Sequence, residues 1–169
     1  MNNVVNANPT KEFFVNMLVR DILLKQAIIE LVDNSIDGAR SIRKDNQYSG
    51  LKITVTFDRN KFIIEDNCGG IPLDVAANYA FRFGRPKTAE SKDTETTGIF
   101  GIGMKRALFK IGNVFSIHST TKTTEFQLEL NVKEWLNKDD NDWDFHFSTY
   151  EDNMNNADEK LGTRIEVTD

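Results

Sequence analysis

The decapeptide ELVDNSIDGA, residues 30–39, is the part of this sequence that decides the fold. Glu30, Asn34 and Asp37 stand four and three residues apart, so they share one face of a helix. Surface helices normally carry such a polar stripe, and a solvated face is one interpretation of it. A carboxylate and an amide one turn apart can also activate a water molecule and ligate a hard cation such as Mg²⁺. The spacing alone leaves both interpretations open.

Apolar residues run through the same stretch at three- and four-residue spacings, the period of an amphipathic helix. They are Ile22, Ile29, Val32, Ile36 and Ala39. This pattern predicts a long helix that begins at Asp21, its expected N-cap, and ends at about Lys44.

The residues beyond this helix predict several strands and two further helices. Alternating, β-rich runs predict a hairpin over 51–57 and 61–66. A short helix is predicted over 73–81, and a second from near Gly101 to about Ile111, ended by Gly112. Further strands are predicted over 113–120, 124–131, 145–150 and 163–168. The expected fold is therefore α+β, a two-layer sandwich with helices on one face of a mixed, mostly antiparallel sheet.

A glycine-rich turn, EDNCGGIP, follows the second strand of the hairpin at residues 65–72. An ordinary turn explains adjacent glycines adequately. Asp66, however, stands at the mouth of this turn, where backbone without side chains can approach a ligand closely. A flat ligand held there would donate from an amino group to the carboxylate.

A second glycine-rich segment, GIFGIGMK at residues 98–105, leads into the second helix. It is not a Walker P-loop, because Met104 follows Gly103 where a lysine should stand, and its glycine order is not that of the Rossmann fingerprint. Bare backbone amides at a helix N-terminus nevertheless form an anion site. Lys105 would add a positive charge there, although an ordinary exposed lysine is an equal alternative.

Length, charge and cysteine content limit the class of protein. The chain has 169 residues of which 39% are hydrophobic, enough for one core, so we expect a single domain with residues 1–10 as a flexible arm. A net charge of −5 provides no basic field for nucleic acid or an anionic membrane. Cys68 is the only cysteine, which excludes an internal disulfide and favours a reducing compartment. With neither a leader nor a long apolar run, a cytoplasmic protein is expected.

The order of these motifs resembles the GHKL ATPase superfamily of gyrase-type topoisomerases, heat-shock chaperones, histidine kinases and MutL proteins. A helical Glu-x3-Asn comes first, then an Asp-Gly turn after a hairpin, then GxxGxG at a helix start, and finally Gly162-Thr163 entering a late strand. The resemblance extends from about Phe13 to Val167 and implies a Bergerat-type ATP-binding domain. ELVDNSIDGA, residues 30–39, is similar to the family's first box, and the sequence around it looks most like the branch of MORC-type ATPases and their bacterial relatives.

The resemblance implies a role for each matching residue. Glu30 matches the general base that polarises the attacking water, and Asn34 matches the Mg²⁺ ligand. Asp66 matches the acceptor of the adenine amino group, and Thr163 the residue that supports it. The residues expected to contact ATP are Asn34, Asp37, Asp66, Gly70, Ile71, Gly98, Gly101, Ile102, Gly103, Met104, Lys105 and Thr163. Residues 82–97 are expected to form a lid over the nucleotide.

Two departures from the family pattern bear on the site. The second box is usually DxGxG, but here Cys68 replaces the first glycine and Gly69 is added, which fits if Cys68 keeps φ below zero. Many relatives also supply a phosphate-sensing lysine from a following transducer domain. Either Lys105 contributes that charge, or the chain is an N-terminal fragment of a longer protein.

The expected function is Mg²⁺-dependent ATP binding and slow hydrolysis to ADP, driving a conformational or dimerisation switch. The expected partners are ATP, ADP and either a second copy of the chain or a transducer domain. One alternative is a switch that binds nucleotide without hydrolysing it. A histidine-kinase-type domain is another, but such kinases lack the water-activating Glu, and His118 and His146 lie in predicted strands.

Overall fold

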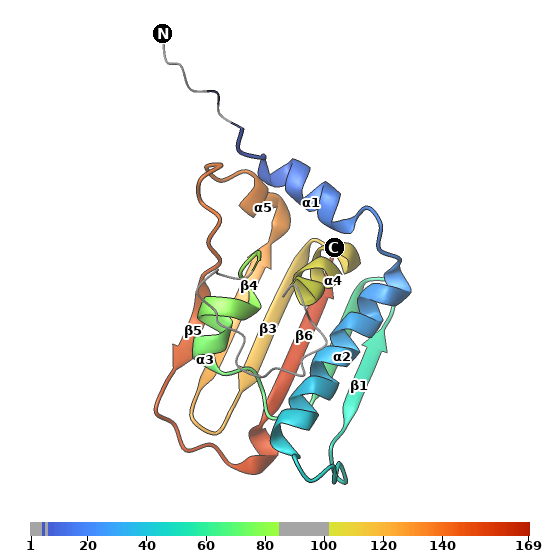
Figure 1. Ribbon diagram of the computed structural model, residues 1–169, viewed down its shortest axis with the longest axis vertical. Coiled ribbons are helices and arrows are strands. Elements are labelled where there is room, and N and C mark those ends of the chain that lie inside the picture. The colour runs from blue at the N-terminus through green and yellow to red at the C-terminus, as the bar shows by residue number, and fades with distance from the viewer. Residues whose placement is uncertain (1–4, 6, 85–101) are drawn as a thin grey trace.

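A six-stranded sheet with helices packed on it forms the architecture of this protein (Figure 1). The computed structural model describes residues 5, 7–84 and 102–169. The strands are β1 (Ile53–Phe57), β2 (Lys61–Asp66), β3 (Val114–Thr120), β4 (Glu125–Asn131), β5 (Phe147–Glu151) and β6 (Gly162–Thr168). The helical elements are α1 (Lys11–Val19), α2 (Leu24–Ile42), α3 (Leu73–Val75), the π-helix η1 (Ala76–Ala80), α4 (Gly103–Ile111), α5 (Val132–Leu136) and the 3-10 turn η2 (Asp158–Lys160).

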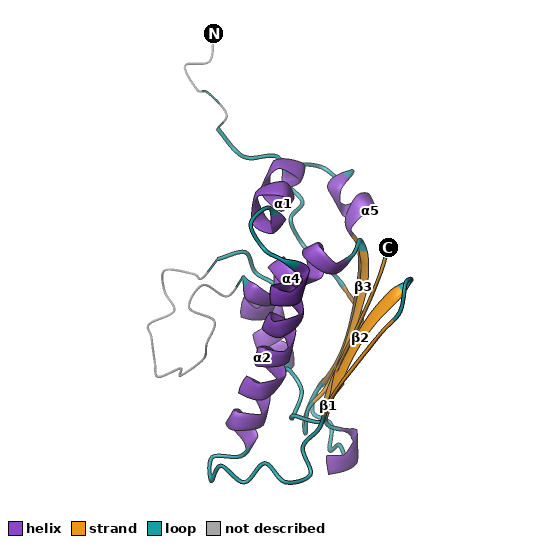
Figure 2. Ribbon diagram, turned by 90° about the vertical axis from the view of Figure 1, so that its right-hand side faces the viewer, coloured by secondary structure: helices purple, strands orange, loops and turns teal. Residues whose placement is uncertain are grey.

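The sheet has the order β1-β2-β6-β3-β4-β5, and every pair of neighbouring strands is antiparallel. The expected α+β fold is therefore confirmed, with antiparallel pairing throughout in place of a mixed sheet. Figure 2 shows α1, α2 and α4 on the same side of the sheet. None of the helices within the described ranges is long and apolar enough to cross a membrane.

The register of β6 brings distant polar residues together. This strand comes last in the chain but pairs with β2 on one side and with β3 on the other. Thr163 consequently lies opposite Asp66 of β2 and opposite Ser119 of β3. Asp66, Thr163 and Ser119 therefore lie in one row across the sheet, and all three belong to the candidate site.

The core lies between the helices and one face of the sheet. Alternate residues of β3 and β4 point into it, including Phe115, Ile117, Phe126 and Leu128, each at most 1% exposed. This alternation is what an antiparallel sheet covered on one side requires. Ser116, His118, Gln127 and Glu129 alternate with these residues on the opposite face, whereas Ser119 of β3 is a polar residue on the buried side.

The buried face of α2 differs from the predicted one. Its buried residues are Ala27, Leu31, Ser35 and Ala39, which recur every four residues, whereas Ile29 is 55% exposed. Three of these four residues are small, so this face is set by close packing more than by hydrophobicity. Placing Ile29 on the apolar face was therefore wrong.

The start of α2 was also predicted wrongly. The helix has Leu23 as its N-cap, and the Leu23 N–H donates to the Gln26 side chain at 2.9 Å. Asp21 instead pairs with Arg20 at 3.0 Å. The carboxylate expected to cap the helix is thus held by a neighbouring guanidinium outside it.

Helix α1 and helix α5 have no counterpart in the sequence prediction. The Lys11 ammonium joins them, because its Nζ donates to the main-chain oxygens of Trp135 at 3.0 Å and Asp139 at 2.8 Å. It also lies 5.0 Å from the Trp135 ring centroid. Lys11 is 1% exposed, so α1 is fixed to the end of α5 by a buried cation.

Candidate active site

The Asp66 carboxylate is the centre of a hydrogen-bond network at the end of β2. Ser35 on α2 donates to Oδ2 at 2.6 Å. The main-chain N–H groups of Cys68 and Thr163 donate to Oδ1 at 2.8 Å and 3.3 Å. A carboxylate has about four lone-pair positions, so three donors leave capacity for one more. A ligand amino group could supply that fourth donor.

Thr163 supports this network in a way that differs in detail from the expectation. Its main-chain N–H reaches Asp66, while its side-chain oxygen lies 3.4 Å from Ser119 Oγ. Ser119 Oγ in turn accepts a 2.6 Å hydrogen bond from the Ile71 N–H. A chain of hydrogen bonds therefore links Thr163 to the turn after β2.

The Asp66 turn, residues 66–72, has glycines where the backbone requires them. Gly69 and Gly70 have φ of +97° and +74°, and Cys68 is not among the residues with positive φ. A Cβ on Gly70 would overlap the Thr120 carbonyl oxygen. Cys68 therefore keeps φ below zero, as a cysteine in this turn requires, because the two glycines after it take the left-handed conformations.

The Cys68 thiol is buried, at 2% exposure. Burial, together with the negative charge of Asp66, raises the pKa of this thiol to about 11. A thiol in this environment is protonated and unreactive at neutral pH. The side chain therefore fills space beneath the turn and is unsuited to nucleophilic chemistry.

The first-box residues lie on α2 as expected from their spacing. Asn34 is exposed, and Glu30 and Asp37 are partly exposed. The Asp37 carboxylate forms an ion pair with Arg40, in which Oδ1 lies 3.2 Å from Nη1. Glu30 and Ser35 are five residues apart, so about 7.5 Å of helix separates the candidate base from the Asp66 contact. Both centres are held against the same helix.

Glu30 lies against the N-terminal end of α4. Its Oε1 accepts a 2.8 Å hydrogen bond from Arg106 Nη2, and both side chains are about one third exposed. A Cβ on Gly103 would overlap Glu30 Oε2. The absence of a side chain at Gly103 therefore lets the carboxylate reach the helix start, where partial positive charge favours an anion.

The rest of the expected phosphate segment is only partly described. Ile102 is the N-cap of α4, and Gly103 and Met104 begin the helix. Gly98, Gly101 and the expected lid from residue 85 onward lie outside the described residues. Phe83, the second residue of the expected lid, contacts Phe14 and Trp143 with ring centroids at 4.9 Å and 6.1 Å.

Lys105 is not the ordinary exposed lysine of the alternative interpretation, because it is 1% exposed. Its Nζ donates to the Ala80 carbonyl at 2.8 Å and lies 6.0 Å from the Phe83 ring centroid. Burial lowers the pKa of the Lys105 ammonium to about 8. A role for Lys105 toward a phosphate stays a prediction.

Three site residues were missed by sequence reasoning: Ser35, Ser119 and Arg106. Ser35 and Ser119 had a visible signal, because each is a polar residue in a series of otherwise apolar, inward-facing positions. Arg106 had none, since its partner Glu30 is 76 positions away in sequence.

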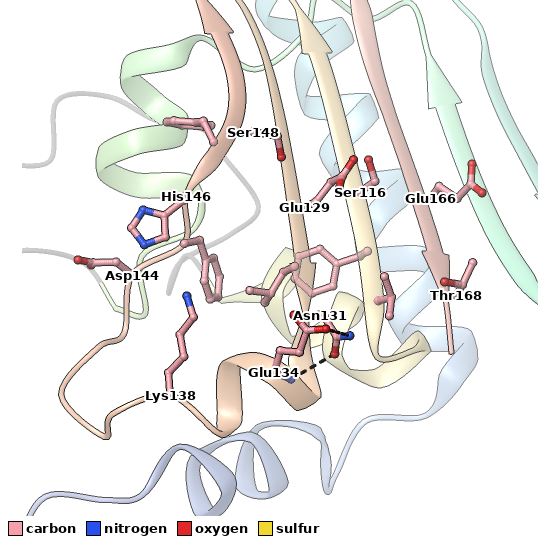
Figure 3. A pocket seen from close by; sticks show the side chains of 15 residues that line it. Ser116, Glu129, Asn131, Glu134, Lys138, Asp144, His146, Ser148, Glu166 and Thr168 are labelled. Atoms are coloured by element: carbon pink, nitrogen blue, oxygen red, sulfur yellow. Dashed lines mark hydrogen bonds between the residues drawn. The ribbon is translucent and has the colours of Figure 1, made fainter.

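A separate hollow of about 650 Å³ lies on the face of the sheet that points away from α2 and α4 (Figure 3). Ser116, Glu129 and Glu166 line it, and each alternates along its strand with buried residues. Because neither Glu30 nor Asp66 lines this hollow, it is distinct from the candidate site.

The combination of fold and site corresponds to a known class of ATPase. A family model described as histidine kinase-, DNA gyrase B-, and HSP90-like ATPase matches residues 22–163. The match covers most of the chain and spans α2, the Asp66 turn and Thr163. The protein therefore belongs to this family, whose GHKL-type members bind and hydrolyse ATP, and the Bergerat fold is consistent with the observed sheet. A search of curated proteins found no significant match.

Proposed function

We propose that this protein binds ATP as its Mg²⁺ complex and hydrolyses it slowly, with Glu30 as the general base. Family membership supports ATP binding and hydrolysis. The observation that carries the proposal is the pair of contacts along α2, Ser35 with Asp66 and Glu30 with Arg106. One elongated ligand placed along this helix reaches an acceptor for its base at one end and a carboxylate beside its phosphates at the other.

Asp66 is proposed to select adenine. Its oxygens already accept from Ser35, Cys68 and Thr163, which orient the carboxylate from two sides. The remaining lone-pair position accepts from the exocyclic amino group of adenine. Guanine carries a carbonyl oxygen at the corresponding ring position, which would face the carboxylate as a second acceptor and be rejected.

Asn34 is proposed to provide the protein ligand for Mg²⁺. Its side chain is exposed one helical turn after Glu30, and an amide oxygen is a ligand type that Mg²⁺ accepts. Mg²⁺ usually keeps waters and substrate phosphates as its other ligands, so one protein oxygen is sufficient. When bound, the ion neutralises phosphate charge.

Glu30 is proposed to accept a proton from the water that attacks the γ-phosphate. The new bond forms between the water oxygen and phosphorus, and the bond to the ADP oxygen breaks. Arg106 engages Oε1, and no described hydrogen bond engages Oε2. The second oxygen therefore supplies the basic lone pair.

Phosphate release and nucleotide binding test this assignment together. Wild type should release phosphate from ATP with Mg²⁺, whereas Glu30→Ala should bind a fluorescent ATP analogue with similar affinity and release phosphate only at a small residual rate. A base acts mainly in the transition state, so binding and turnover separate. Unchanged phosphate release by Glu30→Ala would remove Glu30 from the mechanism.

The proposal extends to a nucleotide-dependent switch. Such a switch would use either a second copy of the chain or a transducer domain. Specific activity that rises with protein concentration, with a shift to dimer in sedimentation with ATP, would support self-association. Activity that is flat across concentration would contradict it.

A further inference from the structure

We propose that Arg106 is a positioning residue for Glu30, holding one carboxylate oxygen so that the other faces the water that attacks ATP. The inference rests on the proposed function of Glu30 as general base. It starts from the 2.8 Å contact between Arg106 Nη2 and Glu30 Oε1, which joins α4 to α2.

The contact engages the carboxylate from one side only. Nη2 reaches Oε1, whereas Oε2 lies where a Cβ on Gly103 would be. Glu30 is therefore confined between a guanidinium and the bare first residue of α4. A base restrained in this way loses rotamer freedom before substrate binds, which favours a single direction of proton transfer.

The position of Arg106 is hard to explain by stability. Its Nε is buried and has no hydrogen-bond partner among the described residues. An unsatisfied buried donor opposes folding, and an ion pair that is one third exposed offsets little of that cost. Methionine at this position would pack the same space without an unsatisfied donor. The arrangement is thus better explained by its effect on Glu30.

Lys105, the preceding residue, is directed elsewhere. Its Nζ donates to Ala80 O, so the two adjacent cations of α4 have different partners. Arg106 is the one that contacts the first-box carboxylate. Because Arg106 contacts Glu30 and Lys105 contacts Ala80, we assign the positioning role to Arg106.

Steady-state hydrolysis by the full 169-residue chain tests the proposal. Arg106→Met should lower kcat between about tenfold and a hundredfold, because a misplaced base costs rate at that scale. KM for ATP and the thermal midpoint should stay close to wild type. Arg106→Lys, which restores a cation, should recover part of the lost kcat.

A matched control and a double variant complete the test. Arg164→Met removes an arginine of similar exposure that pairs with Glu65 and Glu166, both at 2.9 Å, on the sheet face that points away from α2 and α4. The kcat of this variant should equal that of wild type. In a Glu30→Ala background, Arg106→Met should lower the residual rate no further, because the residue acts through Glu30.

The outcomes separate this inference from the proposed function. A wild-type chain that releases no phosphate contradicts the function itself. If wild type is active and Arg106→Met has the same kcat, the positioning role is wrong. A raised KM with unchanged kcat would mean that Arg106 binds phosphate in the ground state, and a further loss in the Glu30→Ala background would mean that it acts independently of Glu30.

Discussion

Ser35 Oγ on α2 donates a 2.6 Å hydrogen bond to Asp66 Oδ2 at the end of β2, and this bond joins the helical layer to the sheet at the candidate adenine site. Ser35 is 7% exposed, so the bond is protected from water. Low local polarity strengthens such a contact and makes its loss costly. The direction of the Asp66 carboxylate therefore depends on the packing of α2 on the sheet as well as on the main-chain N–H groups of Cys68 and Thr163.

Replacing Asp66 by Asn should weaken ATP binding by about one to two decades, the effect of losing a charge-assisted hydrogen bond of roughly 1.5–3 kcal/mol. The Asn amide also turns an NH₂ group toward donors that Asp66 accepts from, which adds local repulsion. Calorimetry measures the affinity. Asp58→Asn is the control, because Asp58 accepts main-chain N–H groups at 2.7 Å and 3.0 Å in the turn at the far end of β2. Equal ATP affinities for both variants would remove Asp66 from the adenine site.

Replacing Asn34 by Ala should weaken the part of ATP binding that depends on Mg²⁺. A metal ligand holds the ground state as well as the transition state, so KM and kcat should both worsen. Titrating ATP with Mg²⁺ and again with EDTA isolates the effect. In EDTA the variant and wild type should bind alike, and a loss of equal size in both conditions would show that Asn34 contacts the nucleotide directly.

The strands could be predicted from sequence because their signal is local. Alternation of apolar and polar residues placed β2 at 61–66, as observed, and placed β3, β4 and β6 within one residue of their observed starts. That Thr163 lies beside Asp66 was predicted only from the family resemblance. Their 97-residue separation leaves no trace in local periodicity.

The contacts that sequence could not predict are those between distant polar groups. Lys11 reaches Trp135 across 124 positions, and a buried lysine contradicts the usual exposure of that residue type. Ile29 was placed on the apolar face by hydrophobicity, although close packing favoured the small residues Ala27 and Ser35. Tertiary packing overrode residue preference in each case.

Replacing Gly103 by Ala should lower turnover without destabilising the fold. The added Cβ overlaps the end of the flexible Glu30 side chain, which can move away at little cost to packing. Gly103 is the first residue of α4, where the preference of a helix for alanine is smaller than in its interior, so the thermal midpoint should stay close to that of wild type. Phosphate release beside a melting curve checks both halves of the prediction. A variant with full activity would show that Glu30 does not need its observed position against α4.

Lys105 should make stability depend on pH between about 8 and its ordinary pKa of 10.5, because burial lowers the folded-state pKa to about 8. In that window the unfolded chain binds more protons than the folded chain, so stability rises with pH. Cys68 acts oppositely: its pKa is raised from 9.0 to about 11, so its contribution falls as pH rises above about 9. Between pH 8 and 9 the Lys105 contribution, a gain of roughly 1 kcal/mol, is therefore larger than the opposing contribution of Cys68. Urea unfolding between pH 8 and 9 should show this rise in stability for wild type and no rise for Lys105→Met. Lys110→Met, which removes another lysine from the same helix, is the control and should show the rise. A wild-type curve that is flat from pH 8 to 9 would mean that the Lys105 ammonium is stabilised inside the fold to the same extent as in water.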